Sequence, residues 1–382
     1  MRKHTDKTVY EAALERIAYC FNSFENVLVS FSGGKDSGVL FNLCYEYAKE
    51  NNLLHKLAIY HLDYEAQYTY TTEYVTNTFE SLKDIRRFWL CLPVGANCGC
   101  KLDSDIWIPW NKADKKVWCR SMPRFDYVIN EDNSPFKVTA GDDDYAIQDC
   151  FSAWFESEYG STAVMIGIRA DESPDRQRLI TLQGWKPSPH KIYPIYDWKT
   201  TDIWVANKKF NYEYNKIYDL FYQAGLNINQ MRVANPFHAC GLDNLKLYRA
   251  IEPKIWGKLL NRVNGVNFGS IYGGTSAVAY RELTKPKHFT WEQYAKFLMD
   301  TNPQPAHHEK IYQFVAKWKQ QGYPDGIPDE ADNQMEKKRD VPSWRRVCAC
   351  LLKNDFTFTG LGFSKVKPAA YHMIKKINLG IK

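Results

Sequence analysis

Two short stretches of this sequence combine residue types that can bind an anion and react with it. The first is Ser32-Gly33-Gly34-Lys35-Asp36-Ser37, where adjacent glycines lie between hydroxyl and charged side chains. Glycine permits positive φ and leaves the backbone bare, so several N–H groups can converge on one anion. The second stretch contains two arginines, which can fork onto an anionic group. We therefore expect an anion site assembled from both stretches.

The first stretch lies between a predicted strand and a predicted helix. Residues 27–31 form an apolar, β-branched run, and apolar residues recur at helical spacing from Val39. A loop at the start of a helix suits a pyrophosphate, because the helix dipole favours negative charge there. The alternative is an ordinary strand-to-helix turn in which Asp36 or Ser37 caps the helix.

The second stretch follows another short hydrophobic strand near Ala163. This strand delivers five polar or small residues to its carboxyl end: Gly167, Arg169, Glu172, Ser173 and Arg176. A further strand, residues 56–63, ends on Asp63. In a parallel α/β sheet the residues just past the carboxyl ends of the strands face the ligand crevice. We therefore include Asp63 in the site, with a helix cap as its alternative role.

The remaining pattern predicts an α/β protein, with a parallel twisted sheet flanked by helices and an α-helical C-terminal domain. We expect a nucleotide-binding domain over residues 1–235 and a mainly helical domain over residues 236–382. Residues 94–149 lose regular periodicity and are interpreted as an insertion over the active-site edge. Arg120 and Arg124 within it could close over phosphates as part of a flap, or form surface ion pairs.

Length, hydrophobic content, cysteine count and net charge limit the classes of protein to which this chain could belong. The chain has 382 residues, 45% of them hydrophobic, which is enough for a substantial core. We see neither an apolar run of transmembrane length nor a signal-peptide pattern near Met1, and expect a soluble, cytoplasmic protein without a membrane partner. The ten cysteines should then be mostly reduced thiols. A net charge of +6 permits an acidic ligand or a nucleic acid without requiring either.

The hexapeptide resembles the PP-loop, Ser-Gly-Gly-x-Asp-Ser, of N-type ATP pyrophosphatases and phosphoadenylyl-sulfate (PAPS) reductases. Residues 167–176 resemble the Gly-x-Arg-x-x-Glu-Ser-x-x-Arg signature of PAPS reductases, and residues 194–204 their Pro-Ile-x-Asp-Trp segment. The resemblance implies an adenine nucleotide alpha-hydrolase-like fold that binds ATP or PAPS. It also implies catalytic roles for Lys35 and Asp36 and, if ATP is bound, Mg²⁺ on Asp36 or Asp63.

The sequence departs from the reductases in its cysteines. Those enzymes act through a cysteine in Glu-Cys-Gly-(Leu/Ile)-His, whereas the nearest string here is Ala239-Cys240-Gly241-Leu242-Asp243. Cys240 is therefore either a nucleophile or a small buried thiol. Cys98, Cys100 and Cys119 fit no ferredoxin or zinc-ribbon spacing, so we expect no iron–sulfur cluster.

The C-terminal region resembles PAPS reductase-like proteins of the immunoglobulin-binding regulator A type. The residues that carry this resemblance include Ile251–Trp256, Arg262–Gly265 and Pro342–Arg346. It implies a place on mobile elements, sulfur metabolism or transcriptional co-regulation, and a ParB-like or sulfiredoxin-like partner protein. Basic spots at 337–339, 345–346 and 365–376 could contact nucleic acid, or form solvated helix faces.

Two hypotheses remain open. In the first, the chain is an enzyme that binds ATP or PAPS for nucleotidyl or sulfonate transfer. In the second, it is a nucleotide-responsive co-regulator without turnover, which acts through a partner protein or DNA.

Overall fold

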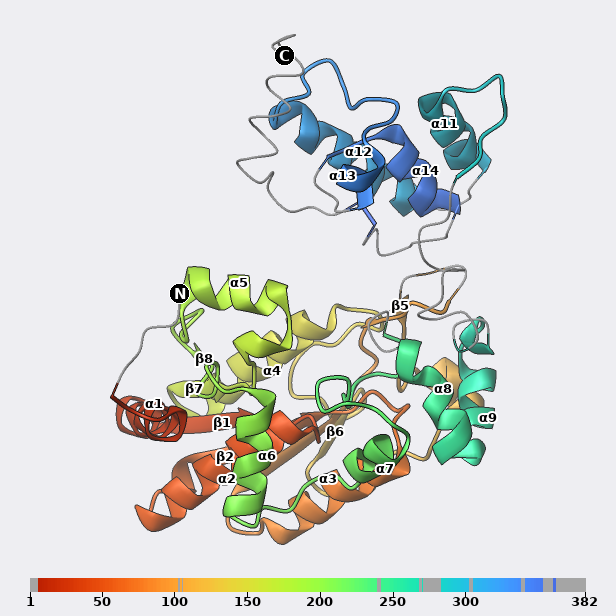
Figure 1. The fold of residues 1–382 in the computed structure, drawn as a ribbon. Coiled ribbons are helices and arrows are strands. Elements are labelled where there is room, and N and C mark those ends of the chain that lie inside the picture. The colour runs from red at the N-terminus through yellow and green to blue at the C-terminus, as the bar shows by residue number, and fades with distance from the viewer. Residues whose placement is uncertain are drawn as a thin grey trace. The chain divides into compact units, whose positions relative to one another are not determined.

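The computed structural model of the chain describes residues 6–101, 104, 106–238, 242–267, 270, 283–301, 305–337, 341–352 and 360–361. The chain divides into two compact units. The first comprises residues 1–97 and 106–263, and the second residues 98–105 and 264–382. Figure 1 shows the elements of each unit in chain order.

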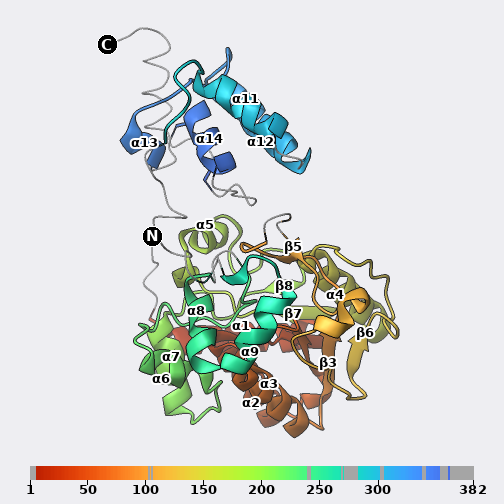
Figure 2. The ribbon, with the colours of Figure 1, turned by 90° about the vertical axis from the view of Figure 1, so that its right-hand side faces the viewer.

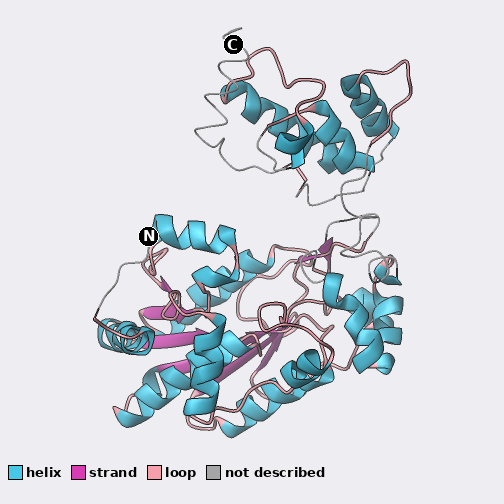
Figure 3. Cartoon of the chain, in the orientation of Figure 1, coloured by secondary structure: helices cyan, strands magenta, loops and turns pink. Residues whose placement is uncertain are grey.

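The first unit is built on a six-stranded sheet in which every neighbouring pair is parallel (Figure 3). Its order is β6-β3-β2-β1-β7-β8. The strands are β1 (Asn26–Ser30), β2 (Leu57–Leu62), β3 (Arg86–Cys91), β6 (Val128–Asn130), β7 (Thr162–Met165) and β8 (Lys191–Ile192). This sheet, with helices around it, confirms the predicted α/β class.

Side chains of the central strands alternate between two buried faces, as the period of a strand requires. Val27 and Val29 join a core with α1 (Val9–Ser23), α2 (Lys35–Glu50), α3 (Thr69–Ser81) and α6 (Thr200–Lys209). Figure 2 shows α2 and α3 lying together on one side of the sheet. Tyr60 of β2 instead packs on α4 (Asp144–Tyr159), with its ring centroid 5.1 Å from that of Phe151. Burial on both faces explains why the strands are continuous apolar runs.

Three connections leave the carboxyl ends of the adjacent strands β2, β1 and β7. The connection after β1 is the glycine loop, which leads into α2, and the connection after β2 leads into α3. β7 is followed by η3 (Ala170–Glu172) and α5 (Pro174–Gln183). Because the three strands are neighbours and parallel, these connections lie at one edge of the sheet. The sequence predicted this edge as the site.

Residues 94–149, interpreted from the sequence as an insertion, contain more regular structure than expected. β6 joins the main sheet beside β3, where Leu90 pairs with Ile129. β4 (Ala96–Asn97) and β5 (Ile106–Trp107) form an antiparallel pair, followed by η2 (Lys112–Val117). α4 begins at Asp144, before the predicted end of the insertion. Strands of two or three residues are too short to show periodicity, which is why the sequence pattern missed them.

The first unit extends beyond the predicted domain boundary at residue 235. It includes α7 (Ile217–Gln223), α8 (Leu242–Ile251) and α9 (Pro253–Arg262), and it ends at Val263. The two resemblance segments Ile251–Trp256 and Arg262–Gly265 therefore begin within this unit. The assignment of the chain to two functional domains stays a prediction.

The second unit is helical in its described part, as predicted. It contains α11 (Trp291–Thr301), α12 (Pro305–Gln320), α13 (Asn333–Lys337) and α14 (Trp344–Leu352). Its core gathers apolar residues from α11, α12 and α14, among them Met299, Phe314 and Val347. Within the described residues, no helix has both the length and the apolar character needed to cross a bilayer.

Two basic residues of the second unit, Arg345 and Arg346, are engaged in hydrogen bonds within it. Arg345 Nε donates to Glu336 Oε2 at 2.8 Å, and the buried Arg346 donates to backbone carbonyls, including that of Gly360 at 3.0 Å. These two arginines thus serve the packing of the unit. Residues 338–340 and 365–376 lie outside the described residues, so nucleic-acid contact stays a prediction.

Candidate functional site

The glycine loop makes its turn at Gly33, immediately after β1. Gly33 has φ of +74°, a region that side chains rarely adopt, and a Cβ there would lie 2.8 Å from Val75 Cγ2. Hydroxyl groups tie the loop to itself: Ser37 Oγ accepts from Ser32 N at 3.1 Å and lies 3.0 Å from Ser32 Oγ. The loop is therefore held in one tight conformation.

The helix after the loop begins without a side-chain cap. α1 starts with a capping box, in which Thr8 Oγ1 accepts from Glu11 N at 3.2 Å. α2 instead has Gly34 at its N-cap position, so its N-cap residue offers no side chain to bind the first turn. The alternative that Asp36 or Ser37 caps this helix is therefore wrong. Uncapped N–H groups at a helix start form an anion site.

Lys35 is largely buried beside the loop. Its Nζ donates to Asp36 Oδ2 at 3.1 Å and to the carbonyl of Met231 at 3.4 Å. Its backbone N–H donates to the hydroxyl of Tyr218, in α7, at 3.0 Å. Burial lowers the pKa of Lys35, and nearby Asp36 opposes that shift. Sequence reasoning missed Tyr218 as a partner of the loop.

The second predicted stretch meets the loop through Gly167 and Arg169. Arg169 Nε donates to Asp36 Oδ1 at 2.6 Å, and its other nitrogens lie within 3.4 Å of Trp198 O and 3.3 Å of Thr200 Oγ1. A Cβ on Gly167 would lie 3.1 Å from Ser37 N. The glycine therefore lets the chain after β7 pack directly on the backbone of the loop.

The rest of that stretch brings further positive charge to the same place. Glu172 forms an ion pair with Arg176, and Arg232 Nη2 donates to the carbonyl of Glu172 at 3.0 Å. Ser173 caps α5, because its hydroxyl accepts from Arg176 N at 3.2 Å. Burial lowers the pKa of Arg176, and neighbouring Arg232 lowers it further. Arg232 is a site residue that the sequence analysis did not select.

Asp63 lies at the same edge but is closed off from it. It is fully buried, and its Oδ2 accepts from Trp89 Nε1 at 2.6 Å and from Arg120. Its Oδ1 accepts from the backbone of Glu65 at 2.8 Å. The proposed role of Asp63 as a helix cap is wrong, because α3 has Tyr68 at its N-cap position. An enclosed carboxylate that already has these donors does not fit a Mg²⁺ ligand.

The flap arginines have different surroundings. Arg120 binds Asp63 and lies over the ring of Trp110, 5.0 Å from its centroid, so it stabilises the strand end and does not cover the loop. Arg124 is exposed. Asp36 is the remaining predicted metal ligand, and it is already paired with Lys35 and Arg169. The described residues contain no group of three side chains that could hold a metal ion.

The predicted nucleophile Cys240 lies outside the described residues. Among the cysteines that the structure describes, Cys150 on α4 is exposed and Cys98, Cys100 and Cys119 are buried. Burial raises the pKa of Cys119 well above its ordinary value, which keeps it an unreactive thiol.

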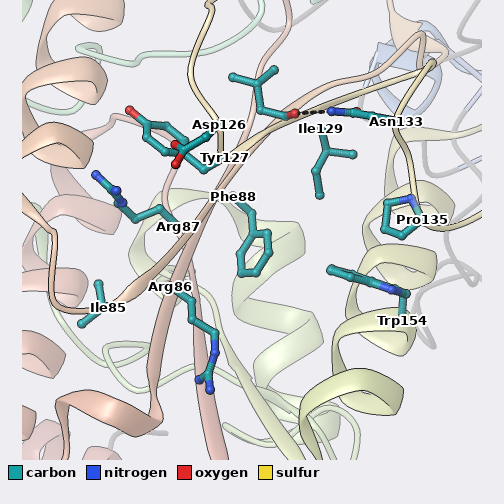
Figure 4. A pocket seen from close by; sticks show the side chains of 11 residues that line it. Ile85, Arg86, Arg87, Phe88, Asp126, Tyr127, Ile129, Asn133, Pro135 and Trp154 are labelled. Atoms are coloured by element: carbon teal, nitrogen blue, oxygen red, sulfur yellow. Dashed lines mark hydrogen bonds between the residues drawn. The ribbon is translucent and has the colours of Figure 1, made fainter.

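A separate groove lies at the opposite edge of the sheet (Figure 4). Its volume is about 470 Å³, and it is lined by the start of β3, the residues before and after β6, and Trp154 of α4. Arg86 and Arg87 in its wall are engaged with the carbonyls of His55 and Phe79, at 3.1 and 2.8 Å. The strands that line it begin there, whereas the loop follows the end of β1. The groove therefore does not belong to the anion site.

Comparison with protein families supports the sequence resemblance in part. Residues 153–224 match the phosphoadenosine phosphosulfate reductase domain. Residues 225–324 and 319–371 match a domain of unknown function, DUF3440. The first match contains the strand-end arginines but not the glycine loop. The finer assignment to the immunoglobulin-binding regulator A type is not among these matches and stays a prediction.

One solved structure and two sequence relatives illustrate the similarity. A PAPS reductase structure from Candida auris, in a phosphate complex, aligns with a TM-score of 0.32 at 14% identity, over 57% of this chain and 93% of that one. A probable FAD synthase of Schizosaccharomyces pombe is 24% identical over 55% of this chain and 63% of its own length. The Escherichia coli K12 protein "Uncharacterized protein YbdN" is 34% identical over 95% of this chain and 92% of its own. Since that similarity extends over nearly the full length of both proteins, the chain belongs to the YbdN family.

Proposed function

We propose that the chain binds an adenine nucleotide with its phosphate groups on residues 32–37. One observation carries this proposal. Arg169, Arg176 and Arg232 lie near the start of α2, where the N-cap residue Gly34 offers no side chain to the first backbone N–H groups. Main-chain N–H groups hold the anion from one side, and the arginines lie on the other. Asp36, Asp171 and Glu172 offset part of the charge of Lys35 and the three arginines, and a phosphate chain would complement the rest.

The sequence relatives indicate which anion this is. A match to a PAPS reductase domain and a relative named as a probable FAD synthase both point to a nucleotide that contains adenine. Glycine loops at helix starts suit pyrophosphate groups in general. We therefore assign the loop to the phosphates of ATP and retain PAPS as the second ligand to test.

The reaction that we propose is nucleotidyl transfer. With the β- and γ-phosphates on the loop, an acceptor would attack the α-phosphorus and pyrophosphate would leave. Lys35, Arg169 and Arg176 would stabilise the charge that develops on the leaving group. If Mg²⁺ accompanies ATP, it would add a further positive charge on the phosphates. The structure favours no protein ligand for it, since Asp63 is enclosed.

Calorimetric titration with a non-hydrolysable ATP analogue, and separately with PAPS, tests the proposal. Arg176→Gln should weaken the binding of ATP by about ten- to 100-fold, the size expected for one charge-assisted hydrogen bond of about 1.5–3 kcal/mol. Arg178→Gln is the matched control, because Arg178 lies on the same helix and is exposed. It should bind like the native chain.

Three other results would change the assignment. A folded native chain that binds neither nucleotide would refute the proposal. Tighter binding of PAPS than of ATP would move the reaction to sulfonate transfer. Nucleotide binding without pyrophosphate release, under any acceptor, would favour the nucleotide-responsive co-regulator.

A further inference from the structure

A second group of polar side chains lies at the same edge of the sheet and has no role in phosphate binding. Tyr64 follows β2, Asp144 opens α4, and His238 follows the turn at Asn235. The hydroxyl of Tyr64 donates to Asp144 Oδ2 at 2.5 Å. α4 leads into β7, so it runs antiparallel to the strands and its first residues lie at the carboxyl edge of the sheet.

This group borders the arginines of the phosphate site. Tyr145, the residue after Asp144, is 72% exposed. Burial lowers the pKa of Arg176, and Tyr145 is close enough to oppose that shift. Burial also raises the pKa of Tyr193, which is close to both Arg176 and Tyr145. Asp144 thus lies one residue away from a side chain that neighbours the proposed phosphate site.

Asp144 and His238 lie in surroundings that favour their uncharged forms. Burial raises the pKa of Asp144, and the hydrogen bond from Tyr64 opposes that shift. Burial lowers the pKa of His238, and Asp144 opposes that shift. A carboxylate with a raised pKa is a stronger base than an ordinary one, and it becomes a useful proton acceptor near neutral pH.

We propose that Asp144 is the general base for the second substrate of nucleotidyl transfer, with Tyr64 and His238 as positioning residues and Tyr145 at the edge of the acceptor subsite. This inference rests on the proposed function. The acceptor class is a neutral hydroxyl or amine compound. A phosphate or carboxylate acceptor has no proton to lose and would be repelled by Asp144, whereas a neutral acceptor needs a base.

The step balances without a further reactant. The acceptor's O–H or N–H proton moves to Asp144 while its lone pair forms a bond to the α-phosphorus. The bond from the α-phosphorus to the bridging oxygen breaks, and pyrophosphate leaves with that electron pair. The product is the adenylylated acceptor. The proton on Asp144 is then released to solvent.

The test measures pyrophosphate release from ATP with hydroxylamine, a small neutral nucleophile, as the probe. Asp144→Asn should lower hydroxylamine-dependent release by about 100-fold or more, within the range for general base catalysis. Its affinity for a non-hydrolysable ATP analogue should stay within about twofold of the native value, because Asp144 contacts no residue of the glycine loop. Asp149→Asn is the matched control on the same helix. Asp149 pairs with Lys191 at 2.6 Å, and its release rate should match that of the native chain.

The pH dependence of pyrophosphate release distinguishes a variant that has lost the positioning of Asp144 from one that has merely misfolded. The titratable groups that face Asp144 are Tyr64, Asp143, Tyr145 and His238. Activity should fall as the pH falls through the raised pKa of Asp144. Tyr64→Phe removes a hydrogen bond that lowers this pKa, so the acidic limb should move to higher pH. This variant decides the matter even if Asp144→Asn does not fold.

Four outcomes would overturn part of this account. The role of Asp144 would be refuted if Asp144→Asn and Tyr64→Phe both released pyrophosphate at the native rate with an unshifted pH profile. It would also be refuted if the native chain bound the ATP analogue but gave no hydroxylamine-dependent pyrophosphate release. In both cases the nucleotide site would stand. A native chain that does not bind the analogue would refute the proposed function first. Reduced analogue affinity in Asp144→Asn would make Asp144 part of the nucleotide site instead.

Discussion

Two carboxylate–arginine groupings lie at neighbouring strand ends, and their carboxylates differ in exposure. After β1, Asp36 pairs with Arg169 and keeps 14% of its side chain exposed. After β2, Glu65 pairs with Arg262 and is fully buried. The open grouping can exchange partners with a ligand, whereas the closed one can only hold the fold. In the proposed function the same residue types at the same edge have different roles, and the exposure of the carboxylate distinguishes them.

The closed grouping is saturated with donors. Both oxygens of Glu65 accept from Arg262, at 2.9 and 3.1 Å, and from the backbone of Cys119 and Trp110, at 2.8 and 2.9 Å. Glu65 itself has φ of +64°, a rare conformation for a residue other than glycine. These contacts join α9 and the segment around η2 to the end of β2. They occupy both carboxylate oxygens of Glu65.

The largest expected effect comes from opening the closed grouping. Glu65→Gln removes the charge that pairs with Arg262, and it should lower the free energy of unfolding by about 3–5 kcal/mol, as is typical for one half of a buried pair. Chemical denaturation of both chains measures this. Glu15→Gln is the control, since Glu15 forms an exposed pair with Lys7 and should change stability by less than about 1 kcal/mol. Equal effects of the two changes would contradict the comparison.

The next largest effect is expected on ATP affinity, from a substitution that displaces the loop at the open grouping but leaves every charged residue in place. Gly167→Ala places a Cβ about 3 Å from the backbone of Asp36 and Ser37, so the loop must shift. ATP affinity measured by calorimetry should fall at least about tenfold, the equivalent of 1.4 kcal/mol. Gly257→Ala is the matched control, because nothing lies within 4 Å of its added Cβ. If Gly167→Ala binds normally, the loop is not the phosphate site.

A smaller effect concerns pH. His61 is buried near Asp63, with Nδ1 2.7 Å from the carbonyl of Phe31. Burial lowers the pKa of His61, so the unfolded chain binds this proton more readily than the folded one. Stability should therefore decline as pH falls below about 6.5, by at most about 1.4 kcal/mol per pH unit from this group. In denaturation series between pH 8 and 5, His61→Gln should flatten the decline. An unchanged slope would mean that other groups cause it.

The smallest expected effect concerns the backbone N–H of Lys35, which already donates a hydrogen bond to the side chain of Tyr218. Tyr218→Phe removes the hydroxyl that accepts from Lys35 N. One neutral hydrogen bond contributes about 0.5–1.5 kcal/mol, so ATP affinity should fall by a factor of about 2 to 10. Calorimetry again measures the change. A rise in affinity would show that the Tyr218 hydroxyl competes with the nucleotide for that amide.

The sequence was sufficient to predict the residues of the open grouping, but it was insufficient to predict the partners of the acids in the closed one. Strand, glycine loop and helix are local, so their pattern predicted where Ser32–Ser37 would lie. The parallel sheet then placed Arg169 next to Asp36, because strands β1 and β7 are neighbours. These inferences needed only periodicity and the rule that ligands bind at the carboxyl ends of parallel strands.

The partners of Asp63 and Glu65 could not be predicted in the same way. Arg262 lies on α9, 197 residues along the chain from Glu65, and no local pattern links the two. Without that arginine, an acid at a strand end looks like a ligand. Tyr218 was missed for the same reason, since its contact with Lys35 spans 183 residues. Burial and long-range pairing are properties of the packed structure.

Amide hydrogen exchange on the native chain, with and without a non-hydrolysable ATP analogue, tests the central claim most directly. If the main chain of the loop holds the phosphates, the analogue should slow exchange at Gly33 to Ser37 and leave the amides of Cys119 and Trp110, which bind Glu65, unchanged. Analogue binding with no protection in the loop would contradict the account.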